Sequence, residues 1–122
     1  MRLARRNSDL PKNILEIRFA TPLDAAQISV NRRLMFADIG ETDANTLLIM
    51  EENYCVWVKE KLEQGEYIGW LGANHKQEII ASTGLWLLEW PPHPLDASLE
   101  KERGHIVDVY VHPDYRKQGI AR

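Results

Sequence analysis

Residues 106–122 read IVDVYVHPDYRKQGIAR, an apolar run, a proline and then a basic loop that contains a glycine. The apolar side chains from Ile106 to Val111 favour a strand, and Pro113 ends it. The basic residues that follow surround Gly119, whose backbone can curve tightly and approach a ligand closely. A strand, a sharp turn and such a loop can present backbone N–H groups to a phosphate. The stretch therefore predicts a phosphate-binding site at the end of a strand.

Two helices are predicted ahead of this stretch. The first begins at residues 21–24, where a Thr cap, a proline and an acid follow one another, and it ends at Gly40. The second begins near Thr42 or Asp43 and ends at Gly65. The apolar stripes expected to face the core are Leu23, Ala26, Val30 and Leu34 in the first helix, and Leu47, Met50, Tyr54, Trp57 and Leu62 in the second.

Four strands are predicted, over residues 14–20, 67–73, 78–88 and 105–111, with a turn at 74–77 and a loop up to about residue 103. Three consecutive strands after two helices favour an antiparallel meander that the helices cover. Residues 1–12 are expected to form a flexible arm and residues 13–122 one domain.

The overall composition is that of an ordinary globular protein, with 44% hydrophobic and 27% charged residues. The net charge of -3 suggests neither a nucleic acid nor a membrane surface as a partner, and no apolar run could span a bilayer. Cys55 is the one cysteine, so we expect no internal disulfide and a cytoplasmic location. The histidines have no partners at ligand spacing, so we expect no metal.

The spacing Arg116-x-x-Gly119-x-Ala121 after Val109-x-Val111-x-Pro113 resembles the acetyl-CoA loop of the GNAT (Gcn5-related) N-acetyltransferases. The predicted order of strands and helices is also similar to the amino-terminal part of that fold. The resemblance implies an α/β fold, with a mainly antiparallel sheet and helices packed on it, and it implies an N-acetyltransferase activity.

In this family a helix follows the loop, whereas Arg122 is the last residue of the sequence. The resemblance therefore implies that the carboxy-terminal part of the domain is missing. We expect residues 1–122 alone to bind acetyl-CoA weakly and to acetylate nothing, because the loop must be ordered on binding. The open strand edge favours a homodimer or a complementing carboxy-terminal segment.

The resemblance implies acetyl-CoA as the co-substrate and a primary amine of a small molecule or peptide as the acceptor. Backbone groups of the last strand would pair with the pantetheine arm, and the loop would bind the pyrophosphate. Two alternatives are a non-catalytic acyl-CoA-binding module and an interaction fragment. The residues expected to bind acetyl-CoA are Val109, Tyr110, Val111, Arg116, Lys117, Gln118, Gly119, Ile120, Ala121 and Arg122.

The base that takes the proton from the amine has no clear match. Several family members carry a glutamate on the last strand, where this sequence has His105 and Val107. His105 is a candidate, since the ordinary histidine pKa of about 6.5 suits a base near neutrality; the alternative is a histidine without a role. Asp108, expected on the face opposite Val107 and Val109, is interpreted as a structural hydrogen-bond acceptor. The residues expected either to touch the acceptor or to pack in the core are Met35, Phe36, Met50 and Tyr54.

Overall fold

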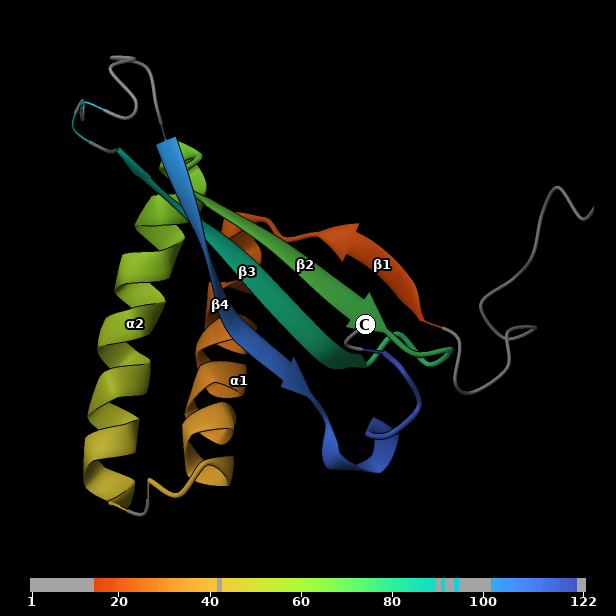
Figure 1. Ribbon diagram of the computed structural model, residues 1–122. Coiled ribbons are helices and arrows are strands. Elements are labelled where there is room, and N and C mark those ends of the chain that lie inside the picture. The colour runs from red at the N-terminus through yellow and green to blue at the C-terminus, as the bar shows by residue number, and fades with distance from the viewer. Residues whose placement is uncertain (1–14, 42, 90, 92–93, 95–101, 121–122) are drawn as a thin grey trace, which may run out of the picture.

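The computed structural model describes residues 15–41, 43–89, 91, 94 and 102–120, which form a four-stranded sheet and two long helices (Figure 1). The predicted arm at residues 1–12, together with Ala121 and Arg122, lies outside the described residues. The elements in chain order are β1 (Glu16–Phe19), the 3-10 turn η2 (Pro22–Asp24), α1 (Ala25–Asp38), α2 (Ala44–Gln64), β2 (Tyr67–Ala73), β3 (Ile79–Glu89), β4 (Glu102–Val111) and the 3-10 turn η3 (Pro113–Tyr115).

The sheet is antiparallel throughout, in the order β1-β2-β3-β4, so that β1 and β4 are its edge strands. Both helices cover the same face of the sheet, with α1 beside β4 and α2 packed on α1 and β2 (Figure 1). The predicted meander and α/β fold are confirmed. None of the described helices has the length and apolar character that a membrane crossing needs.

Local signals set the ends of the second helix as expected. The side chain of Asp43 accepts hydrogen bonds from the backbone amides of Asn45 and Thr46, and these bonds lower the pKa of its carboxyl group. At the other end Gly65 takes the left-handed conformation, with φ of 73°, and closes the helix.

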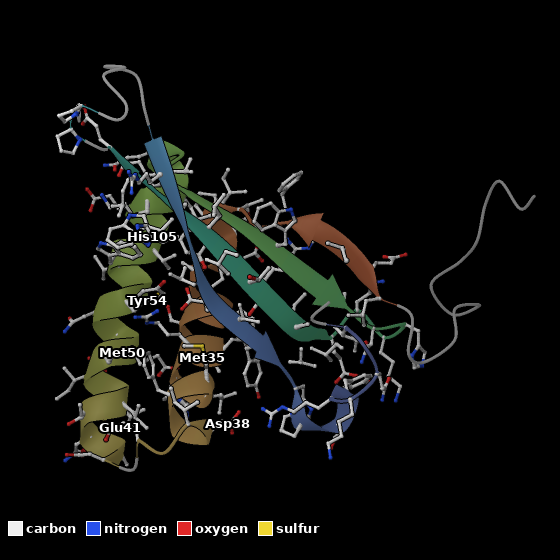
Figure 2. All side chains as sticks on the ribbon, in the orientation of Figure 1. Met35, Asp38, Glu41, Met50, Tyr54 and His105 are labelled. Atoms are coloured by element: carbon white, nitrogen blue, oxygen red, sulfur yellow. The ribbon has the colours of Figure 1, made fainter. Side chains whose placement is uncertain are left out.

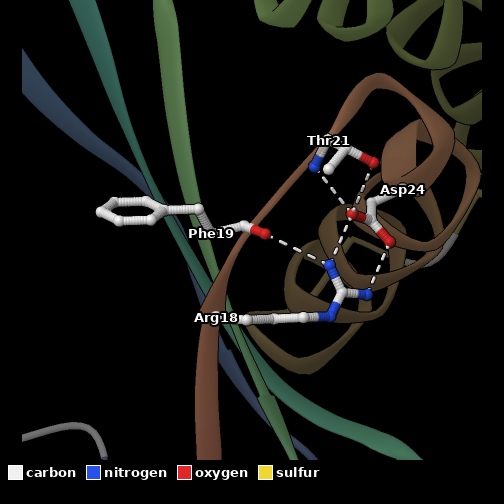
Figure 3. A network of polar contacts seen from close by, with 4 residues as sticks. All are labelled: Arg18, Phe19, Thr21 and Asp24. Atoms are coloured by element: carbon white, nitrogen blue, oxygen red, sulfur yellow. Dashed lines mark hydrogen bonds and ion pairs between the residues drawn. The ribbon is translucent and has the colours of Figure 1, made fainter.

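The first helix is anchored to the edge strand before it (Figure 3). The guanidinium of Arg18 on β1 donates to both carboxylate oxygens of Asp24, at 2.8 and 2.9 Å. The same carboxylate accepts from the backbone N–H of Thr21 at 2.8 Å, which caps the 3-10 turn. The bond from Arg18 is the main reason that the pKa of Asp24 lies below its ordinary value.

The predicted buried stripe of the first helix is wrong at Leu23 and Ala26, while Val30 and Leu34 are half-buried. Leu23 is 94% exposed and Ala26 is exposed, whereas Ile28 is buried. The reason is the 3-10 turn at residues 22–24, which shifts the phase of the α-helix that follows. The residues that α1 buries are Ala25, Ile28, Ser29 and Asn31.

Two of the buried α1 residues are polar, and both have partners. Ser29 donates to the carbonyl of Ala25 at 2.7 Å, and the amide of Asn31 donates to the hydroxyl of Ser82 on β3 at 2.9 Å. Buried polar groups are tolerated when they are hydrogen-bonded in this way. The bond to Ser82 therefore helps to hold α1 on the sheet.

Apolar residues of both helices and of β2 form the core. The buried cluster consists of Ala25, Ile28, Val58, Tyr67 and Leu71. Of the predicted second stripe, Leu47 is buried, and Tyr54, Trp57 and Leu62 pack against the cluster while half-buried. The position that sequence periodicity missed is Val58, which is fully buried.

Candidate functional site

An irregular step in β4 sets the geometry of the site. Between the pairs Gly84–Val107 and Ser82–Tyr110, β3 has one residue and β4 has two. The extra residue makes a β-bulge, and Asp108 within it has φ of 59°, in the left-handed region. Such backbone is uncommon for a residue other than glycine, although aspartate is among the side chains that adopt it most readily.

The bulge also overturns the prediction that Asp108 faces away from Val107. Val107 packs against the core cluster on the helix-covered side of the sheet, and the carboxylate of Asp108 reaches tyrosines of α2 and β2 on that same side. Side chains alternate between faces only while the strand stays regular, and the left-handed residue breaks the alternation.

Asp108 is a buried acceptor for three side chains, as its structural interpretation predicted. Asp108 is 3% exposed, and its carboxylate accepts hydrogen bonds from the hydroxyls of Tyr54 at 2.5 Å and Tyr67 at 2.9 Å. The guanidinium of Arg32 on α1 supplies the third bond, at 2.6 Å. The network joins α1, α2, β2 and β4 at one point.

The charge of Asp108 is compensated by Arg32, and both tyrosines stay protonated. Burial is the main cause that raises the pKa of Tyr54 and of Tyr67 far above the ordinary value, and the neighbouring carboxylate adds to it. Both phenols therefore act as hydrogen-bond donors at neutral pH, and neither is suited to take a proton from an amine.

A first cavity, of about 520 Å³, lies beside this network, between the helices and β4. Figure 2 shows Met50 and Tyr54 one turn apart on α2, with Met35 on the neighbouring helix. Of the four residues expected either to touch the acceptor or to pack in the core, Met50 and Tyr54 line this cavity, while Phe36 contacts the guanidinium of Arg32. The lining residues are Arg32, Met50, Asn53, Tyr54, Trp57, Trp86 and Val107.

A second cavity, of about 660 Å³, continues along β4 toward the basic loop. On the helix side Met35, Asp38 and Ile39 line it. Gln118 is not among the lining residues, and Ala121 and Arg122 lie outside the described chain. The predicted acetyl-CoA residues that do line it are Val109, Tyr110, Val111, Arg116, Lys117, Gly119 and Ile120.

The loop starts in a well-defined turn. The ring nitrogen Nδ1 of His112 accepts from the backbone amide of Asp114 at 3.2 Å, and the amide of Tyr115 donates to the carbonyl of His112 at 2.9 Å. Lys117 and Gly119 then have φ of 64° and 80°. Alternation of ordinary and left-handed residues makes a concave array of backbone N–H groups, the arrangement that binds phosphate groups.

Arg116 ties the loop to the rest of the fold. Its guanidinium contacts the carboxylate of Asp38 on α1, donates to the carbonyl of Val111 at 2.8 Å and lies over the ring of Tyr110. The charge of Arg116 is thus shared with Asp38. The loop fits an anionic ligand through its backbone turn and the positive charges of Arg116 and Lys117.

His105 lies near the start of β4, and its label stands above that of Tyr54 in Figure 2. It is exposed, pairs in register with Trp86 and has its ring centroid 6.4 Å from that of Trp86. Trp86 lines the cavity and His105 does not. Within the described residues, no cluster of three metal-binding side chains is present.

The two cavities follow one another along β4 on either side of Asp108, which is buried and lines neither of them. On β4, Val107 lines the first cavity and Val109 the second. On α1, Arg32 lines the first cavity and Met35, about one turn further along, lines the second. Sequence reasoning missed Arg32, because its partner Asp108 lies 76 residues further along the chain. A charged residue in an amphipathic helix gives no sign of such a distant partner.

The family comparison matches residues 23–122 with the model of the acetyltransferase (GNAT) family. A GCN5-related N-acetyltransferase from Ralstonia eutropha JMP134 is 34% identical, with a TM-score of 0.76, over 88% of this chain and 69% of that one. A comparison with curated protein sequences gave no match.

Two further solved structures share the fold at lower identity. A predicted acetyltransferase with acetyl-CoA from Clostridium acetobutylicum is 20% identical, with a TM-score of 0.76, over 88% of this chain and 66% of that one. An aminoglycoside acetyltransferase from an uncultured soil metagenomic sample is 17% identical, with a TM-score of 0.59, over 88% and 64%. The chain thus spans about two thirds of the length of the structures that it matches.

Proposed function

The chain belongs to the acetyltransferase (GNAT) family, and from this premise we propose that it takes part in the transfer of an acetyl group from acetyl-CoA to a primary amine. The observation that carries the proposal is the pair of cavities on either side of the bulge of β4. One cavity ends at a loop shaped for a pyrophosphate, and the other is lined mainly by apolar and aromatic side chains.

The larger cavity is the proposed site for acetyl-CoA. The backbone turns at Lys117 and Gly119 would hold the pyrophosphate, and the positive charges of Arg116 and Lys117 would attract it. The strand residues from Val109 to Val111 border the same cavity and would pair with the amide-containing pantetheine arm. In this arrangement the thioester would lie toward the bulge, on the side of the first cavity.

The reaction requires the amine to reach the thioester as a neutral nucleophile. Its lone pair attacks the carbonyl carbon, a C–N bond forms, the C–S bond breaks, and the products are the acetamide and the CoA thiol. The bulge takes Asp108 and Val109 out of regular pairing with β3, and we propose that a backbone N–H there stabilises the negative charge on the carbonyl oxygen. The proton that the amine loses passes to a base or to water.

His105 is the proposed base, acting through water from its position beside Trp86, which lines the first cavity. A histidine can accept a proton only in its neutral form, so a rate that depends on it rises with pH, and removal of a general base lowers the rate by about 10²–10⁴-fold. We expect His105→Gln to lose the neutral limb of the pH–rate profile. If the limb persists in this variant, the role belongs to water or to the substrate.

Release of CoA thiol from acetyl-CoA by the full-length protein, recorded for a panel of primary amines, tests the proposal. Amine-dependent release together with an N-acetylated product supports acetyl transfer. Tight binding of acetyl-CoA without release under any condition supports the alternative of a non-catalytic acyl-CoA-binding module. Failure of acetyl-CoA to bind removes both.

A further inference from the structure

The first cavity has aromatic walls. The rings of Tyr54 and Trp57 stack with centroids 5.2 Å apart, and Trp57 meets Trp86 edge to face at 5.2 Å. Such rings are held in place by one another and offer flat apolar surfaces to a ligand. A cavity of about 520 Å³ with these walls suits a small molecule that carries an apolar or aromatic group.

One wall of the cavity carries a guanidinium with unused donors. Arg32 donates to Asp108 through Nη1, and its terminal nitrogens make no other hydrogen bond within the described part of the chain. Its Nε also lacks a partner there but is buried, out of reach of a ligand. Its side chain is 24% exposed, so it remains accessible from the cavity. The rings of Tyr54 and Phe36, at 4.2 and 5.0 Å, fix the guanidinium in position. A guanidinium has five N–H donors and can hold a second carboxylate beside the first.

The charges around the cavity favour an anionic group on the ligand. No acidic residue is among the described residues that line it. The carboxylate nearest to it, that of Asp108, is buried and already accepts from three side chains. A second cationic group on the acceptor would find no acidic partner among these lining residues, whereas a carboxylate would meet the guanidinium of Arg32, a donor that its bond to Asp108 holds in place.

The position of Arg32 limits where the amine can be. Arg32 bonds to Asp108, and the next residue, Val109, already lines the cavity proposed for acetyl-CoA. A carboxylate held at Arg32 therefore lies close to the bulge that separates the two cavities. An amine on the carbon next to the carboxylate stays near the bulge. An amine at the far end of a long chain is directed toward the aromatic walls.

We propose that the acceptor is the α-amine of an amino acid with an apolar or aromatic side chain. Arg32 binds its carboxylate, and Tyr54, Trp57 and Trp86 contact its side chain. This inference rests on the proposed acetyl transfer, whose acceptor class the family does not define. It excludes polyamines and other acceptors that need a second positive charge to be bound.

Calorimetric titration of the full-length protein with three matched compounds tests the inference. L-Phenylalanine has both groups, 3-phenylpropionate lacks the amine, and phenethylamine lacks the carboxylate. We expect the two carboxylates to bind about tenfold or more tightly than phenethylamine, since charge-assisted hydrogen bonds have about that effect. Equal or tighter binding of phenethylamine, or no binding of either carboxylate, overturns the inference.

Two pairs of variants attribute the preference to this cavity. Arg32→Lys keeps the charge beside Asp108 and removes the planar fork, and we expect the preference for carboxylates to fall at least threefold, an effect of modest size for a bidentate contact. Arg33→Lys, the same change at a neighbour that pairs with Glu51 outside the cavity, should leave it unchanged. An unchanged preference in folded Arg32→Lys contradicts the assignment.

The second pair does not touch the core network. Asn53 is exposed and lines the cavity, so Asn53→Asp introduces a negative charge there with little change of shape. We expect it to weaken L-phenylalanine binding and strengthen phenethylamine binding, whereas Asn45→Asp near the start of α2 should do neither. Identical shifts in both variants contradict a local effect.

Turnover separates this inference from the proposed function. If the protein acetylates phenethylamine but not L-phenylalanine, the inference about the acceptor is wrong and the proposed acetyl transfer is supported. Binding of L-phenylalanine as expected, without thiol release from acetyl-CoA for any amine, supports the inference on the ligand and overturns the proposed reaction.

Discussion

The cavity beside Asp108 and the basic loop after β4 are held in shape by opposite means. Asp108 and Arg32 pair in the interior, where their side chains are 1% and 24% exposed, and two tyrosines complete the network. Arg116 and Asp38 make the corresponding contact for the loop at the surface, where both side chains are about 40% exposed. The first cavity is therefore built on the core, while the loop is attached to the core from outside.

This difference predicts that substitutions in the two regions will affect different properties of the protein. A change in the buried network alters the stability of the whole fold, because several elements meet there and an unpaired buried charge is unfavourable. A change in the loop alters the affinity for an anionic ligand and leaves the stability nearly constant, because exposed ion pairs contribute little. The following predictions test that division, with the largest expected effect first.

Asp108→Asn should be the most destabilising of the substitutions considered. It leaves the guanidinium of Arg32 without its buried counter-charge, and loss of one partner from such a pair lowers the free energy of unfolding by about 3–5 kcal/mol. Chemical denaturation monitored by circular dichroism measures the change. If the free energy of unfolding falls no more than it does in a surface variant, the contrast between the buried network and the surface loop is wrong.

The buried tyrosines should make the fold sensitive to alkaline pH. The pKa values of Tyr54 and Tyr67 are raised in the folded protein, so their contribution is fully present below the ordinary tyrosine pKa of about 10 and is lost as pH rises beyond it. We expect constant stability from neutral pH up to that point and a steep fall above it.

Absorbance of tyrosinate checks the alkaline prediction. In the folded protein, Tyr54 and Tyr67 should ionise only as the fold opens, while in urea all tyrosines should titrate near the ordinary value. Tyr54→Phe should reduce the dependence of stability on alkaline pH and lower the stability at neutral pH by about 1–3 kcal/mol, since Asp108 loses a donor. Normal titration of all tyrosines in the folded state would contradict the buried network.

Asp38→Asn is the surface counterpart of the same chemical change. It removes the negative partner of Arg116, and exposed pairs of this kind contribute about 0–1 kcal/mol. The same denaturation experiment should show almost no change in the free energy of unfolding. A loss as large as that of Asp108→Asn would show that the loop belongs to the core after all.

The elements that short-range chemistry determines were predictable from the sequence. The cap at Asp43, the glycine that ends α2 and the 67–73 strand depend on neighbouring residues, and all three are found as expected. The α/β class followed from the order of such elements, and the family from the spacing around Gly119.

The geometry of the site depends on contacts that no local pattern encodes. The bulge at Asp108 lies in a run that reads as regular alternation, and the start of β4 at Glu102, three residues earlier than predicted, depends on pairing with β3. The partnership of Arg32 and Asp108 joins residues 76 positions apart. The phase of α1 was misread for a related reason, because a 3-10 turn ahead of it changes which residues face the sheet.

The most direct test of the account is the affinity of acetyl-CoA for two valine variants of the full-length protein, measured by calorimetry. Gly119→Val and Gly65→Val introduce the same side chain at left-handed glycines, with φ of 80° and 73°. Forcing a residue with a Cβ into that conformation costs about 1–2 kcal/mol, so we expect Gly119→Val to weaken binding about tenfold or more and Gly65→Val, at the end of α2, to leave it unchanged. Equal affinities in the two variants would contradict the placement of acetyl-CoA at the loop.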